Sequence, residues 1–183
     1  MCIRDRLGRD TLARMMAGGR TSIAVGLAAM ALSLFFGSFI GVTAGFYKRL
    51  DGILMRFTDL FLSLPLLPLL LVMMLLFREP LSEAYGPERG MFVLIVVSIG
   101  ITSWMPTARI VRADVLALKE REFVLAAKAS GTSDTLIILR HIMPNVLSPI
   151  MVSATLGIAN GIITESALSF LGLGFPPDFP PWG

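Results

Sequence analysis

The chain has 183 residues, of which 55% are hydrophobic and 16% are charged, and its formal net charge is +3. Ordinary soluble domains carry about 25% charged residues, and this chain has too little polar surface to cover its apolar segments, which argues against a soluble fold. The single cysteine, Cys2, and the single histidine, His141, exclude an internal disulfide and a metal site built on Cys or His. No basic stripe with interleaved aromatic residues points to nucleic acid.

Four long runs of the chain are almost free of charge. They lie at 21–47, 60–77, 90–108 and 142–177, and only the last contains a charged residue, Glu165. Roughly 20 apolar residues are needed to cross about 30 Å of hydrocarbon as a helix. The sequence therefore predicts an all-α integral membrane protein with four spans.

The first span is preceded by a charged N-terminal segment that lacks the apolar core of a signal peptide. We expect a short helix over 10–20 that ends at Gly18 and Gly19, followed by a span over 22–46. Small residues recur along this span, and they are Gly26, Gly37, Gly41 and Gly45. Such residues mark a helix face that packs closely on another helix in a membrane.

The second and third spans are expected over 59–77 and 91–108. Pro65 and Pro68 should kink the second span or unwind its first turns. A charged loop is expected between the two spans, over 78–89.

A polar segment, 109–144, then interrupts the apolar chain, and we call it the charged loop. We expect a helix over 113–130 that is broken at Gly131, because glycine tolerates the left-handed conformation that often ends a helix. A second helix, over 135–142, should follow.

The end of the charged loop also carries helix signals. Thr132 or Ser133 can cap the second helix, and Pro144 should end that helix and begin the fourth span, which reaches about Leu173. Within the fourth span, Glu165 and Ser169 lie four residues apart and therefore on one helix face. A carboxyl group there should face the bundle interior rather than lipid.

The charged loop is too charged to enter lipid and too apolar to float free in water. It could anchor in a groove on a soluble partner, or it could lie on the bilayer as an amphipathic pair. Arg121 and Glu122 are the charged residues that we expect at its contact surface.

The loops also predict an orientation. Four alternating spans place 48–56 and 109–141 on one side, where nine Lys and Arg residues lie, and place 1–20 and 78–89 on the other side, which has seven. Excess Lys and Arg marks cytoplasmic loops. We therefore expect the charged loop to be cytoplasmic.

The segment AAKASGTSDTLIILRHIMP resembles the EAA loop of type I ABC-importer permeases. The residues that fit the spacing of that motif are Ala126, Ala127, Gly131 and Pro144. Two positions depart from it, since Leu125 stands where glutamate is usual and Met143 stands where leucine is usual. The missing glutamate removes the polar contact that it would make.

Other segments resemble the dipeptide/oligopeptide/nickel subfamily of these permeases. They are LGRDTLARMMAGGRTSIAVGL (7–27), DGILMRFTDLFLSLP (51–65), ARIVRADVLALKEREFVLAA (108–127) and ESALSFLGLGFPP (165–177). The closing motif, 180–183, departs at Pro181, where the subfamily usually has serine.

The resemblance implies a fold and a domain organisation. Residues 19–183 would form the helical bundle of the type I ABC-importer transmembrane domain, preceded by an extracytoplasmic segment at 1–18. Such permeases typically have six spans, so we expect the first and last spans to be missing from this sequence. MCIRDR matches nothing expected upstream of LGRD, and we expect it not to be native.

The resemblance also implies a function. The charged loop would be the coupling loop that docks on a separate ATPase, and this chain has no phosphate-binding G-x-x-x-x-G-K-[ST] motif of its own. ATP and Mg²⁺ would then be bound by the ATPase, with no cofactor, metal or catalytic residue in this chain. The other implied partners are a homologous second permease, an extracytoplasmic substrate-binding protein and membrane lipid.

The expected activity is import of peptides across the cytoplasmic membrane of a bacterium or archaeon by alternating access. Nickel, glutathione or oligosaccharides are the alternative cargoes. A membrane enzyme would need a nucleophile and a base together, and a channel would need charge rings or filter carbonyls. Neither pattern stands out. Glu165 and Ser169 are instead expected to line the translocation path or to make an interhelical contact.

Overall fold

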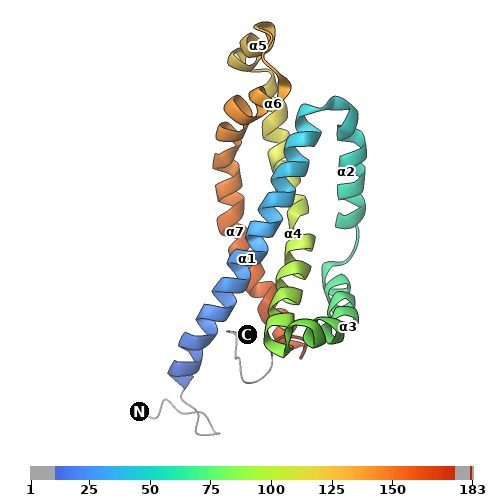
Figure 1. Cartoon of the computed structure of the whole chain (residues 1–183), viewed down its shortest axis with the longest axis vertical. Coiled ribbons are helices and arrows are strands. Elements are labelled where there is room, and N and C mark those ends of the chain that lie inside the picture. Colours follow the sequence, from blue (N-terminus) through green and yellow to red (C-terminus); the bar gives the residue numbers. More distant parts are fainter. Residues whose placement is uncertain (1–10, 176–181, 183) are drawn as a thin grey trace. The chain divides into compact units, whose positions relative to one another are not determined.

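The computed structural model describes residues 11–175 and residue 182. These residues are helical apart from short turns, and no strand occurs among them. The elements in chain order (Figure 1) are α1 (Thr11–Phe46), α2 (Lys48–Leu62), α3 (Leu66–Tyr85), α4 (Pro87–Lys119), α5 (Glu122–Ala129), α6 (Asp134–Ile137), the π-helical turn η1 (Ile138–Ile142) and α7 (Met143–Phe170). The expectations for MCIRDR and for Pro181 lie outside the described residues.

The helices account for the predicted membrane spans. Three continuous stretches are long and apolar enough to cross a membrane, and they are Met15–Phe46, Pro87–Lys119 and Asp134–Phe170. Helices α2 and α3 meet the same criteria together, with a bend of 83° between them. Pro65 lies in this break, where its ring prevents a regular helical hydrogen bond. The structure therefore has three continuous candidate spans, and it reaches the predicted four only if α2 and α3 are counted as one broken span. The predicted interruption of the second span at Pro65 is confirmed.

The chain divides into two compact units. Unit 1 comprises Met1–Met30, Leu66–Ile101 and Gly157–Gly183, and unit 2 comprises Ala31–Pro65 and Thr102–Leu156. The long helices α1, α4 and α7 therefore each contribute residues to both units.

Unit 1 has an apolar core drawn from α1, α3, α4 and α7. Its buried members are Val25, Ala29, Leu70, Met74, Met91, Leu94, Ile95, Ile99 and Leu168. The segment 78–89, expected to be a loop, is helical except for Gly86, whose φ is 84°. Pro87 occupies the first position of α4, which proline favours. A Cβ on Gly90 would lie 2.4 Å from the Leu81 carbonyl oxygen, so glycine allows the two helices to meet closely.

The N-terminal glycine pair does not end a helix, which corrects the sequence prediction. Helix α1 continues through Gly18 and Gly19 without a break. Both residues are buried, and a Cβ on Gly19 would lie 2.8 Å from Cζ2 of Trp182. Glycine costs a helix only about 1 kcal/mol relative to alanine, so it is tolerated here, where it makes room for an indole ring.

Unit 2 is built on close packing of α1 against α4. A Cβ on Gly37 would lie 2.8 Å from the Trp104 carbonyl oxygen, and one on Gly41 would lie 2.7 Å from that of Ala108. A Cβ on Gly45 would lie 2.7 Å from the Cβ atom of Val115. The G-x-x-x-G face predicted from the sequence is therefore a helix-packing face.

The connection 48–56 is helical rather than a loop. Only Tyr47 separates α1 from α2, and its carbonyl accepts hydrogen bonds from the N–H groups of Leu50 and Asp51 at 3.0 and 3.2 Å. The chain therefore reverses at one extended residue, and α2 lies beside α4 (Figure 1), as the ion pairs described below require.

Candidate functional site

The charged loop is anchored to unit 2 by one apolar side. Val124, Ile137 and Ile142 are fully buried in a core cluster with Val111 and Val115 of α4. The loop is thus held in a definite place on the helices, although most of its other residues are exposed. An element anchored in this way can transmit a force that is applied to its outer surface.

The first half of the charged loop differs from its prediction. Helix α4 extends to Lys119, the chain breaks at Glu120 and Arg121, and α5 begins at Glu122. Arg121 has an extended conformation, with φ −73° and ψ 144°. The expected single helix over 113–130 is therefore two helices, and the turn between them allows Val124 of α5 to join the buried cluster with Val111 and Val115.

Gly131 ends α5 in a Schellman motif. Its φ is 77°, which confirms the positive φ expected there. The Thr132 N–H donates to the Ala127 carbonyl, and the Gly131 N–H donates to that of Lys128, both at 3.1 Å. A Cβ on Gly131 would have no neighbour within 4 Å, so conformation rather than space makes glycine the favoured residue.

The second half of the charged loop runs directly into the last span. Ser133 occupies the N-cap position of α6, as expected, but its side chain makes no capping hydrogen bond. Pro144 does not end the helix, which is continuous from Asp134 to Phe170 and passes through η1. Proline lacks an N–H and crowds the preceding turn. The wider π turn fits such a site, and the Asn145 side chain donates to the His141 carbonyl at 2.6 Å.

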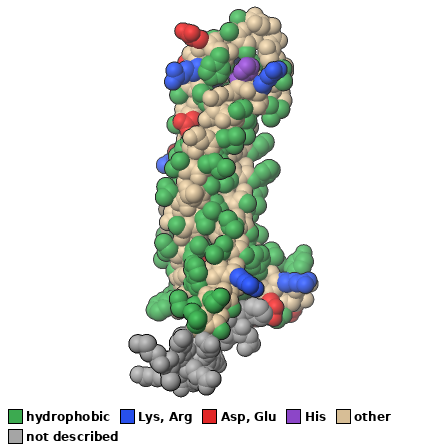
Figure 2. Space-filling model, turned by 90° about the vertical axis from the view of Figure 1, so that its left-hand side faces the viewer, with side chains coloured by type: hydrophobic (Ala, Val, Ile, Leu, Met, Phe, Trp, Pro, Cys, Tyr) green, Lys and Arg blue, Asp and Glu red, His purple; other side chains and the backbone are tan. Residues whose placement is uncertain are grey.

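The outer surface of the charged loop mixes apolar and charged side chains. The exposed apolar residues are Phe123, Leu125, Leu136 and Leu139. Arg121, Glu122 and Ala126 are also exposed, and Ala127 is half-buried. Figure 2 shows charged side chains among hydrophobic ones at the top of the view, where Figure 1 places α5 and α6. Apolar side chains that are exposed together in this way can pack against another apolar surface.

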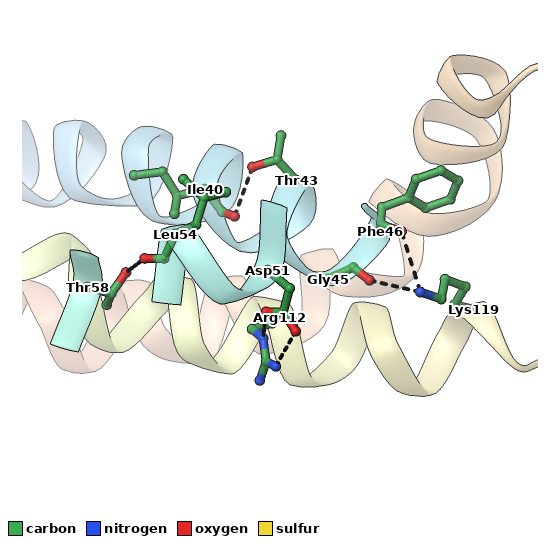
Figure 3. Close-up of polar contacts among 9 residues, drawn as sticks. All are labelled: Ile40, Thr43, Gly45, Phe46, Asp51, Leu54, Thr58, Arg112 and Lys119. Atoms are coloured by element: carbon green, nitrogen blue, oxygen red, sulfur yellow. Dashed lines mark hydrogen bonds and ion pairs between the residues drawn. The ribbon is translucent and has the colours of Figure 1, made fainter. Parts of the chain in front are cut away.

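Polar contacts join the base of the charged loop to α1 and α2, and sequence reasoning did not find them. Lys119 donates to the carbonyl oxygens of Gly45 and Phe46, at 3.3 and 3.4 Å, and so caps the C-terminus of α1 (Figure 3). Arg112 binds both carboxylate oxygens of Asp51, one of them at 2.6 Å.

A second ion pair, between Arg109 of α4 and Asp59 of α2, joins the same two helices as the pair of Arg112 and Asp51. We call these contacts together the α1–α2–α4 joint. The sequence did contain a signal for these ion pairs. Asp51 and Asp59 stand in a basic segment, and two arginines, three positions apart, stand at the start of the charged loop.

Glu165 lies in unit 1 and is completely buried. Its carboxylate accepts a hydrogen bond from Ser22 of α1 at 3.1 Å and one from Ser169 at 2.8 Å. The backbone N–H of Trp182 donates a hydrogen bond to the Ser22 hydroxyl at 3.1 Å. The indole N–H of Trp182 donates to the Met15 carbonyl at 2.8 Å. The carboxylate thus joins α7 to α1, and within the described residues it makes an interhelical contact.

A family of membrane transport proteins matches most of the part of the chain that forms the helices and the charged loop. The family described as the binding-protein-dependent transport system inner membrane component matches residues 33–177. The chain belongs to this family. The charged loop, the α1–α2–α4 joint and Glu165 all lie within the matched residues.

Individual known proteins are similar to this chain over nearly its whole length. A putative peptide transport system permease protein of Brucella suis biovar 1 is 38% identical over 180 residues, which cover 98% of this chain and 57% of that protein. The oligopeptide transport system permease protein OppC of Bacillus subtilis is 39% identical, with coverage of 98% and 55%. The dipeptide transport system permease protein DppC of Alkalihalophilus pseudofirmus is 37% identical, with coverage of 98% and 56%. The chain therefore spans a little over half the length of these relatives.

Proposed function

We propose that this inner-membrane component acts within the permease of an ATP-driven importer, in the cytoplasmic membrane of a bacterium or archaeon. Peptides are the proposed cargo, because the similar proteins named above are peptide, oligopeptide and dipeptide permeases. Nickel chelates, glutathione and oligosaccharides are the alternatives. A second permease subunit and an extracytoplasmic substrate-binding protein complete the proposed transporter.

The observation that carries the proposal is the construction of the charged loop. Its inner side is fixed to unit 2 by Val124, Ile137 and Ile142, and its outer side presents exposed apolar and charged residues. We propose that this outer side docks on a separate ATPase subunit, with Arg121 and Glu122 at the contact. ATP and Mg²⁺ are then bound by the ATPase, and the closure of that subunit moves the loop.

The α1–α2–α4 joint supports transmission from the loop to the spans. Lys119 stands at the last position of α4 and holds the C-terminus of α1. A displacement of the loop therefore acts directly on α1, and through Arg112 and Asp51 on α2. Alternating access needs such rigid connections, because packed helices move as bodies rather than deform continuously.

The proposal is tested by a charge placed on the docking surface. Leu125→Asp, co-expressed with the ATPase subunits of the same transport system, should abolish their co-purification with this chain, because a buried unpaired carboxylate is costly at an interface. Tyr85→Asp is the matched control, since Tyr85 is also exposed but lies at the α3–α4 turn. Equal retention of the ATPase by both variants would contradict the docking assignment.

A further inference from the structure

Helix α2 carries an exposed apolar stripe in addition to the face that packs in unit 2. The stripe consists of Leu50, Ile53, Phe57 and Leu60, which recur every three or four residues and therefore share one side of the helix. Thr58 is fully buried on another side, and Asp51 is paired with Arg112. The stripe faces away from these contacts and is free to meet another apolar group.

The charge beside this stripe is positive. Both acidic residues of α2 are engaged by arginines of α4, Asp51 by Arg112 and Asp59 by Arg109. The basic residues Lys48, Arg49 and Arg56 are exposed and form no ion pair with any residue in the described part of the chain. Helix α2 therefore presents uncompensated cations to its surroundings.

Two of these cations border the stripe directly. Arg49 lies four residues before Ile53, and Arg56 lies three residues after it, so both are neighbours of Ile53 on the helix surface. Seven residues separate the two arginines by about 10 Å along the axis. Their long side chains can converge on one anionic group while the stripe contacts an apolar chain.

The position of α2 along the chain matches a membrane interface. The apolar stretch of α1 ends at Phe46, and Lys48 and Arg49 follow at once. A long arginine side chain that starts within the apolar region can extend its charged end toward the lipid headgroups. We expect Arg56, which lies further along α2, to extend in this way. The apolar stripe, the cations at its border and the interfacial position together match an anionic phospholipid, which has an apolar chain and a negatively charged headgroup.

We propose that this face of α2 is a binding site for an anionic phospholipid. The acyl chain lies along the stripe, and the phosphate is held by Arg49 and Arg56. A zwitterionic lipid fits less well, because its ammonium group is repelled by the same cations. The site is separate from the charged loop, so it stands or falls independently of ATPase docking.

Native mass spectrometry of the purified chain in neutral detergent tests the site, with phosphatidylglycerol and phosphatidylcholine titrated separately. The double variant Arg49→Gln/Arg56→Gln should bind phosphatidylglycerol about thirtyfold more weakly, since each basic residue near an anionic surface contributes roughly a fivefold effect. Its binding of phosphatidylcholine should not change.

The matched control is Arg78→Gln/Arg89→Gln. It removes the same charge from two exposed arginines in unit 1, and it should keep the wild-type affinity for phosphatidylglycerol. An equal loss in both double variants, or no preference of the wild-type chain for the anionic lipid, would overturn the proposal.

A photo-crosslinking amino acid at Phe57 provides an independent readout in vesicles that contain both lipids. The expected product is an adduct with phosphatidylglycerol, enriched over its share in the vesicle. An adduct with a second copy of the chain or with another membrane protein would identify the stripe as a protein interface and would overturn the lipid assignment.

Discussion

At the scale of single residues, two positions combine an unusual environment with a clear physical requirement. Gly131 has a positive φ in an open environment, whereas Glu165 is a carboxylate with no exposed surface. A substitution at the first changes backbone conformation alone, and a substitution at the second changes a buried hydrogen-bond network. The two residues lie in different units.

Gly131→Val should uncouple ATP hydrolysis from transport. A β-branched residue at a φ of 77° carries strain of roughly 1–3 kcal/mol, so the Schellman turn should reorganise and displace α6. The measurement is substrate-stimulated ATPase activity and transport of the assembled importer. Gly52→Val is the control, because Gly52 also has open space but lies within a helix without a positive φ. Unchanged coupling in Gly131→Val would count against the role of the turn.

Glu165→Ala should destabilise the chain more than Glu165→Gln does. Alanine leaves the Ser22 and Ser169 hydroxyls without their acceptor, and a buried unsatisfied group costs about 1–3 kcal/mol. Glutamine keeps an accepting oxygen at the same place. Thermal unfolding in detergent measures the difference. If both variants unfold like the wild type but fail to transport, Glu165 and Ser169 act in the translocation path rather than as an interhelical contact.

At the scale of helices, unit 2 is held by two kinds of contact between neighbouring elements. Glycines let α1 approach α4 closely, and ion pairs attach α2 to α4. The first contact depends on shape and the second on charge geometry. Each can be changed without altering the exposed outer surface of the charged loop.

Gly41→Ala should destabilise the packing of α1 on α4. The added methyl group would meet the Ala108 carbonyl at 2.7 Å and Val111 at 2.8 Å, and these atoms cannot move without separating the helices. Gly161→Ala is the control, because its Cβ would find ordinary contacts at 3.6 Å or more, and helix propensity alone favours alanine by about 1 kcal/mol. Melting temperatures in detergent should fall for the first variant only.

The two ion pairs of the α1–α2–α4 joint should differ in strength. Arg112 and Asp51 form a two-point contact with side chains 31% and 23% exposed, whereas Arg109 and Asp59 are 52% and 57% exposed. Exposed pairs contribute about 0.2–1 kcal/mol, and two-point arginine–carboxylate pairs contribute more. Double-mutant cycles with alanine should give the larger coupling energy for Arg112 and Asp51. Equal coupling energies for the two pairs would show that neither the two-point contact nor the lower exposure strengthens the pair of Arg112 and Asp51.

At the scale of the whole molecule, the orientation of the chain in the membrane decides which compartment the charged loop faces. A cysteine at Glu122, in a chain whose Cys2 is replaced by serine, should react with a membrane-impermeant thiol reagent from the cytoplasmic side only. Alternation of the spans places the α3–α4 turn on the other side, so a cysteine at Glu83 should react only from outside. The reverse pattern would invert the topology and would remove the charged loop from contact with any cytoplasmic ATPase.

The sequence alone determined the fold class, the three continuous candidate spans, the bend at Pro65 and the positive φ at Gly131. These features follow from local properties, namely runs of apolar residues, the missing N–H of proline and the missing side chain of glycine. The small-residue face of α1 was also predictable, because close helix packing in a membrane requires it.

Only the tertiary structure decided the helix boundaries and the polar contacts. Gly18, Gly19 and Pro144 suggest helix ends, but the helices continue through them because packing partners and a π turn offset the local preference. Whether a charged residue such as Lys119 meets water or a carbonyl depends on which helix ends lie beside it. That is a long-range relation, between residues more than 70 positions apart, which local sequence patterns do not encode.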